Sequence, residues 1–119
     1  MPLVEEGWFE HPAAELIATE YLDPLKRSGV DVMVLGCTHY PLLKPLLQRI
    51  MGPATRLIDS GEETAAAVES ALRTTGLDAP ADGDPYHRFV VSDDEARFRQ
   101  VGSRFIGERL GQAEVVPLG

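Results

Sequence analysis

A short strand pattern followed at once by a helical pattern is the feature that most limits how this chain of 119 residues can fold. Residues 30–35 form an apolar run rich in β-branched side chains, which predicts a buried strand. Apolar residues then recur at the spacing of a helix, namely Leu42, Leu43, Leu46, Leu47 and Ile50. Gly52-Pro53 ends this helical pattern. Pro45 falls in the first turn of this helix, where its missing N–H costs little.

The same alternation of strand and helix patterns continues along the chain. Short strands are predicted at residues 56–58, 87–91 and 114–116. Alternating patterns of this kind are typical of an α/β fold with mostly parallel strand pairing. We therefore expect a three-layer architecture in which helices flank a mostly parallel sheet.

Three further helices are predicted from their stripes and caps. The first helix follows Pro12, is interrupted late by Pro24 and is stopped by Gly29. Its apolar stripe consists of Leu16, Ile17, Tyr21, Leu22 and Leu25. The other two open with capping boxes, Ser60 with Glu63 and Ser92 with Glu95, and run to about Thr75 and Ile106. The larger aromatic side chains are expected in the core, namely Trp8, Phe9, Tyr21 and Phe105.

A linker is predicted where glycine, aspartate and proline gather, between Gly76 and Pro85. Residues 77–84 would then separate a segment 1–76 from a segment 85–119. The pattern leaves open whether the linker joins two layers of one domain or two different domains.

Charge and composition exclude several classes of function. The formal net charge is −8, from 19 acidic and 11 basic residues, and the longest basic run is Lys26-Arg27. These values argue against nucleic acid and anionic membrane surfaces as partners. No apolar run approaches the roughly 20 residues of a membrane span, and the N-terminus lacks the pattern of a signal peptide. The single cysteine forms no internal disulfide, which fits a reducing cytosol.

That cysteine, Cys37, is the candidate reactive group. It follows the predicted strand, precedes a predicted helix and has His39 two residues on, and a helix N-terminus or a nearby cation favours the thiolate. Thr38 and the loop N–H groups could bind a carboxylate. Two alternatives remain open from local sequence. Cys37 could be a small buried hydrophobic residue, or it could provide one half of a metal site with His39, although the chain has no second cysteine pair.

Three segments resemble one family of enzymes. Residues 35–43, Leu-Gly-Cys-Thr-His-Tyr-Pro-Leu-Leu, resemble the second cysteine motif of bacterial glutamate racemases. Residues 2–7, Pro-Leu-Val-Glu-Glu-Gly, resemble an upstream segment of that family, and residues 57–65 resemble its downstream strand-to-helix turn. In aspartate racemases of the same superfamily a glutamate typically stands at the position of His39, so His39-Tyr40 favours the glutamate enzyme.

The resemblance implies a reaction and a set of roles. Family members interconvert L- and D-glutamate without a cofactor, using two cysteines on opposite faces of the substrate, and they supply D-glutamate for peptidoglycan in the bacterial cytoplasm. Cys37 would be one acid/base thiol, Thr38 would hold the substrate, and His39 would assist proton movement and binding. Glu5 matches a carboxylate that supports the same half-site, whereas Glu6 and Glu10 are expected to be solvated and Asp59 and Ser60 to provide turn and cap chemistry. A homodimer is also implied, and no metal.

One departure from the family is large, because the chain has one cysteine and the mechanism needs two. The family's first cysteine segment has no counterpart here, so the chain is expected to be the C-terminal portion of a longer, pseudo-symmetric two-domain enzyme. Residues 1–76 would belong to the second domain, 77–84 to the crossover, and 85–119 would return to the first domain. We expect the chain alone to be inactive and to need the missing N-terminal half.

Two other functions stay open at this point. One is a racemase of the same superfamily with another substrate, such as aspartate or a hydantoin. The other is a non-catalytic α/β module that keeps the carboxylate-binding loop without the chemistry, and the single cysteine is what favours it.

Overall fold

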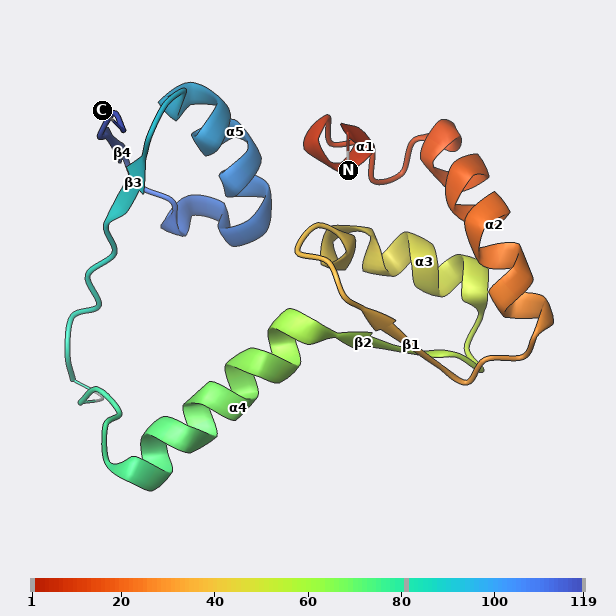
Figure 1. Ribbon diagram of the computed structural model, residues 1–119, viewed down its shortest axis with the longest axis horizontal. Helices are drawn as coiled ribbons and strands as arrows, with labels where there is room; N and C mark the ends of the chain where they lie inside the picture. The colour runs from red at the N-terminus through yellow and green to blue at the C-terminus, as the bar shows by residue number, and fades with distance from the viewer. Residues whose placement is uncertain (1, 81, 119) are drawn as a thin grey trace. The chain divides into compact units, whose positions relative to one another are not determined.

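The computed structural model describes residues 2–80 and 82–118 of the chain (Figure 1). It is an α/β protein in which the chain forms two compact units, Met1–Asp78 and Ala79–Gly119. Strands pair in parallel within each unit, as predicted, with β1 beside β2 and β3 beside β4. The described strands form two separate two-stranded sheets, one in each unit.

The first unit contains most of the helices. Its elements in chain order are α1 (Pro2–Glu5), α2 (Pro12–Arg27), β1 (Val32–Leu35), the 3₁₀ turn η1 (Tyr40–Leu43), α3 (Lys44–Met51), β2 (Arg56–Asp59) and α4 (Ser60–Thr75). The predicted strands and the order of the helices are therefore present, and Pro45 lies in the first turn of α3 as expected.

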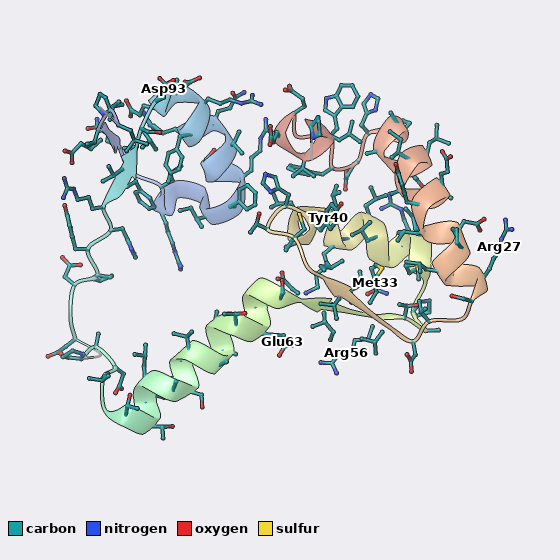
Figure 2. The ribbon with its side chains drawn as sticks, in the orientation of Figure 1. Arg27, Met33, Tyr40, Arg56, Glu63 and Asp93 are labelled. Carbon is teal, nitrogen blue, oxygen red and sulfur yellow. The ribbon has the colours of Figure 1, made fainter. Side chains whose placement is uncertain are left out.

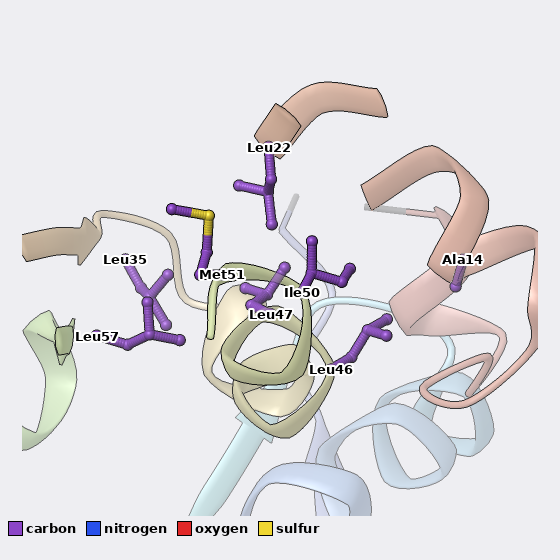
Figure 3. Packing of buried hydrophobic residues seen from close by; sticks show 8 residues of the cluster. All are labelled: Ala14, Leu22, Leu35, Leu46, Leu47, Ile50, Met51 and Leu57. Atoms are coloured by element: carbon purple, nitrogen blue, oxygen red, sulfur yellow. The ribbon is translucent and has the colours of Figure 1, made fainter. Parts of the chain in front are cut away.

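The core of this unit gathers around α3 (Figure 3). The helical stripe predicted from the leucines is buried here, through Leu46, Leu47, Ile50 and Met51. Leu35 and Leu57 pack onto it from the two strands, and Ala14 and Leu22 pack onto it from α2. The short helix α3 therefore links the sheet to α2.

Polar contacts fix the turn between α3 and β2. The buried Thr55 donates its hydroxyl to the carbonyl oxygen of Val30 over 2.9 Å, and Gln48 donates to the carbonyls of Gly52 and Thr55 over 2.8 and 2.9 Å. Lys26 donates to the Ile50 carbonyl over 2.7 Å. The bond from Lys26 satisfies a carbonyl in the last turn of α3, where the end of a helix leaves carbonyls without helical partners.

Both predicted helix caps are corrected to a neighbouring aspartate. Asp59, and not Ser60, caps α4, since its carboxylate accepts the N–H groups of Gly61 and Glu62. Asp94, and not Ser92, caps α5 (Glu95–Ile106), through the N–H of Arg97. In both cases an aspartate stands directly before the first helical residue, where its carboxylate reaches the free N–H groups. The predicted helix ends at Thr75 and Ile106 are confirmed.

The prediction that Pro24 interrupts the first helix is wrong. Helix α2 continues through Pro24 to Arg27, and Gly29 follows with a φ of 71°. A proline removes only one helical hydrogen bond, and here it does so in the last turns, where the helix would soon end.

The expected burial of the α2 stripe and of the first strand is also corrected. Ala14 and Leu22 are buried in α2, but Leu16, Ile17, Tyr21 and Leu25 are exposed, since the eight-residue α3 covers only part of this helix. Val32 and Val34 are exposed as well, because side chains alternate across a strand and α3 covers one face. The aromatic residues expected in the core are largely outside it: Tyr21 is 78% exposed, Trp8 and Phe105 are exposed, and Phe9 is half-buried.

The second unit is a single β-α-β motif. Strand β3 (Phe89–Val91) leads into α5, the 3₁₀ turn η2 (Gly107–Arg109) and β4 (Ala113–Val115), and β3 and β4 pair from Phe89 with Ala113 to Val91 with Val115. Leu110 and Ala113 are buried, and Arg88 pairs with Glu114 across the strands. A Cβ atom at Gly102 would lie 2.8 Å from the Leu110 side chain, so the glycine permits α5 and Leu110 to pack closely.

Within the described residues, no helix has the length and apolar character needed to cross a membrane.

Candidate functional site

Two strand ends position the candidate site. β1 and β2 run parallel and in register, so Leu35 at the end of β1 pairs with Asp59 at the end of β2. Cys37 follows the first strand by two residues, and Ser60 follows the second directly. Ligands of parallel α/β sheets bind outside the carboxyl ends of the strands, which is where these residues meet.

A pocket of about 540 Å³ opens at this edge of the sheet. One wall comes from the loop after β1 and from η1, the other from the first turns of α4. Tyr40 marks the first segment and Glu63 the second in Figure 2. The lining residues are Cys37, Thr38, Pro41, Asp59, Ser60, Gly61, Thr64 and Ala65.

Cys37 is half-buried in this wall and reaches the pocket. A cysteine that only fills space would sit in the apolar core, and the core cluster of this unit does not include Cys37. The thiol is therefore placed where a small molecule can reach it.

The predicted residues Thr38, His39 and Glu5 lie together beside the thiol loop. The hydroxyl of Thr38 and Nδ1 of His39 are 3.0 Å apart, and Nε2 of His39 lies 3.7 Å from a carboxylate oxygen of Glu5, the last residue of α1. The His39 side chain is 20% exposed. An imidazole held between a carboxylate and a hydroxyl has both ring nitrogens oriented, which suits a group that helps to move protons.

The second wall contains residues that sequence reasoning did not assign to the site. Asp59 caps α4, and the Ser60 hydroxyl donates to the Leu35 carbonyl over 2.8 Å. Gly61, Thr64 and Ala65 also line the pocket. The signal was present in the predicted parallel pairing, since the loops after two adjacent parallel strands meet at one edge.

An ion pair joins the two walls. Lys44, the first residue of α3, donates to a carboxylate oxygen of Glu62 in the first turn of α4 over 2.7 Å. This hydrogen bond raises the pKa of Lys44 above its ordinary value, and the nearby carboxylates of Asp59 and Glu63 act in the same direction.

Among residues 2–80 and 82–118, no three His, Cys, Asp or Glu side chains are grouped as a metal site would require.

Several curated proteins similar to this chain are named glutamate racemase. It is 48% identical over 118 residues to a glutamate racemase of Syntrophus aciditrophicus and 47% identical over 119 residues to one of Neisseria meningitidis. These matches cover 99% and 100% of this chain but only 44% of each relative. The chain thus spans less than half the length of the curated relatives it matches. A scan against protein-family models found no match.

Solved structures agree with the sequence relatives. The chain superposes on a glutamate racemase of Thermus thermophilus in complex with β-chloro-D-alanine, with a TM-score of 0.85 and 37% identity over 98% of this chain and 44% of that one. It superposes on a glutamate racemase of Francisella tularensis in complex with D-glutamate, with a TM-score of 0.83 and 31% identity over 97% and 43%. In sequence and in fold, the chain matches the C-terminal portion of the glutamate racemase family.

Proposed function

We propose that this chain provides one half of the active site of a glutamate racemase, with Cys37 as the acid/base for one face of the substrate α-carbon. The observation that carries the proposal is the placement of the only cysteine of the chain in a pocket at the ends of two parallel strands, within a sequence 46–48% identical to glutamate racemases. Racemases of this kind would act on glutamate without a cofactor.

The chemistry requires two groups on opposite faces of the α-carbon. A base removes the α-proton from one face, and an acid delivers a proton to the other, so that the centre is inverted. The carbanionic intermediate needs donors that are already in place where negative charge develops. Cys37 would serve one face in both directions of the reaction, as thiolate or thiol. The second thiol would come from the part of the enzyme that the relatives have in addition to this portion.

The neighbours of Cys37 have roles that follow from their positions. Thr38, which lines the pocket, would bind the substrate through its hydroxyl or backbone N–H. His39 would assist proton movement at Cys37 and help to bind the substrate. Glu5 would orient the His39 ring through the 3.7 Å contact with Nε2.

The biological setting is part of the same proposal. The enzyme would supply D-glutamate for peptidoglycan in the bacterial cytoplasm and would work as a homodimer. Residues 1–76 would belong to its second domain, residues 77–84 to the crossover, and residues 85–119 to its first domain, completed by the missing N-terminal half.

A chimera tests the proposal directly. The N-terminal remainder of the Syntrophus aciditrophicus racemase would be joined to this chain, and the circular-dichroism signal of D-glutamate would be followed over time. We expect no racemisation by the chain alone and measurable racemisation by the chimera. Cys37→Ser should lower the chimera's rate roughly 10²- to 10⁴-fold, the range of acid–base catalysis. Racemisation at full rate by the chain alone, or by the Cys37→Ser chimera, would overturn the proposal.

The single cysteine also favours a second candidate, a module that binds a carboxylate without catalysis. Calorimetric titration of this chain with D-glutamate, with and without Cys37→Ser, separates the two when read beside the chimera. Binding that ignores the thiol, together with an inactive chimera, would favour the module. Activity of the chimera on aspartate or a hydantoin in place of glutamate would point to another racemase of the superfamily.

A further inference from the structure

The helix α4 forms one wall of the Cys37 pocket, yet apolar packing does not hold it there. Every residue from Gly61 to Thr75 is exposed, and none of the residues of α4 belongs to the core. In Figure 1 the helix continues from the end of β2 and extends away from α2 and α3. Its position against the thiol loop must therefore depend on covalent continuity with β2 and on polar contacts.

Polar contacts of Ser60 and Glu62 join the start of α4 to the other wall. One is the hydrogen bond from Ser60 to the Leu35 carbonyl, at the end of β1. The other is the 2.7 Å ion pair between Glu62 and Lys44, which directly follows η1. The ion pair joins α4 to the η1–α3 segment, which carries Pro41 of the pocket wall.

The ion pair differs from the other short pairs of the first unit. Arg27 with Asp23 and Arg73 with Glu69 each join residues four positions apart on one helix. Lys44 and Glu62 are 18 residues apart and belong to different elements. The Lys44 side chain is 33% exposed and the Glu62 side chain 70%, so this is a surface ion pair. A pair of this kind restrains the distance between two elements, whereas a pair within one helix cannot.

We infer that the Lys44–Glu62 ion pair is a positioning device that holds the first turn of α4 near the Cys37 loop and so limits how widely the pocket opens beside the thiol. Neither residue lines the pocket, so the pair acts through the segments it joins. As a role in catalysis, this inference rests on the proposed function. As a statement about access to Cys37, it can be tested without any racemase activity.

The test uses the single cysteine of the chain as its own reporter. Alkylation by neutral iodoacetamide would be timed for the unaltered chain, Lys44→Met and Glu62→Gln, with far-ultraviolet circular dichroism to verify folding. If the ion pair restrains α4, removing either charge lets the first turn of α4 move away from the Cys37 loop. Both variants should then be alkylated roughly two- to fivefold faster than the unaltered chain, the size of effect expected for a surface ion pair. If the charges act only through their field on the thiol, the two variants should shift the rate in opposite directions.

Matched controls are present on the same helix. Arg73→Met and Glu69→Gln remove the same charges from a pair that lies outside the pocket, and they should leave the alkylation rate unchanged. Lys44→Arg should retain the slow rate, and the reversed double variant K44E/E62K should restore it. This double variant also covers the case in which a single variant folds poorly.

The inference is overturned if the two single variants move the rate in opposite directions, if neither changes it, or if the reversed double variant fails to restore it. Protection of Cys37 by D-glutamate provides a separate check in the same assay. A lack of protection would count against the proposed function and would leave the positioning role of Lys44 and Glu62 intact.

Discussion

Ser60 donates its hydroxyl to the carbonyl oxygen of Leu35 over 2.8 Å, and so connects the first residue of α4 to the last residue of β1. The bond is partly buried and joins residues 25 positions apart. It connects the two loops that form the pocket at the point where both leave the sheet. The arrangement depends on the parallel register that places Leu35 beside Asp59.

Replacing Ser60 by alanine should therefore destabilise the first unit. A hydrogen bond of this kind contributes about 0.5–1.5 kcal/mol, and its loss also leaves a half-buried carbonyl without that partner. Urea unfolding followed by circular dichroism measures the change. Ser103→Ala is the control, since its hydroxyl bonds an exposed carbonyl within α5 and its loss should have a smaller effect. Equal destabilisation by both variants would contradict this role for Ser60.

Asp59→Ala should lower the helix content of α4 more than Asp59→Asn does. The Asp59 carboxylate accepts two N–H groups of the first turn, and loss of such a cap costs about 1 kcal/mol, up to about 2. Because no residue of α4 is buried, little packing can offset that loss. Asparagine keeps an acceptor oxygen in the same place. The ellipticity at the helix band reports the difference, and equal signals from both variants would show that the cap is dispensable.

Leu46→Ala should destabilise the chain by about 2–5 kcal/mol, the range for deleting a leucine side chain from a core. Leu46 is 2% exposed and lies in the cluster around α3. Leu16→Ala is the matched control, since Leu16 is 72% exposed and its loss should change the unfolding free energy by no more than about 0.5 kcal/mol. A large effect at Leu16 would mean that the exposed stripe of α2 is covered in solution.

The stabilising effect of Lys44 should disappear at alkaline pH. Its hydrogen bond to Glu62 raises the pKa of Lys44 in the folded chain above the ordinary value of 10.5. A group with a raised folded pKa stabilises the fold below its unfolded pKa, and that contribution is lost as the pH rises through the folded pKa. The unfolding midpoint of the unaltered chain should exceed that of Lys44→Met at pH 7 to 9, and the two should converge above pH 11 or so. A gap that stays constant with pH would exclude the charged amine as its cause.

Glu5→Gln should slow the chimeric racemase through His39. The carboxylate lies 3.7 Å from Nε2 of His39, and an amide would orient the ring less firmly. A small misplacement of a catalytic group can cost as much as about 10²-fold in rate, so we expect a fall in kcat of roughly 10- to 100-fold with little change in KM. Glu10→Gln, at an exposed position nearby in sequence, is the control. A rise in KM alone would assign Glu5 to substrate binding instead.

The sequence by itself determined the kinds and order of the elements, and it pointed to Cys37 as the candidate reactive group. Strand and helix periodicities are local, so residues 30–35 and the leucine stripe of α3 could be assigned without knowing what they pack against. The segment around Cys37 likewise carried its family resemblance in consecutive residues, and the relatives confirmed that resemblance. The roles of Cys37, Thr38, His39 and Glu5 stay predictions until the chimera is measured.

Only the tertiary structure decided what depends on residues far apart in the chain. The second wall of the pocket, with Gly61 and Thr64, became visible once β1 and β2 were paired in register. The exposure of Tyr21 and Val34 follows from how little surface the short α3 can cover. Periodicity reveals that a face is apolar, but burial requires a partner, and the position of that partner is set by contacts across the chain. Cys37 was therefore recognised from its neighbours in sequence, whereas the pocket it lines was formed by its neighbours in space.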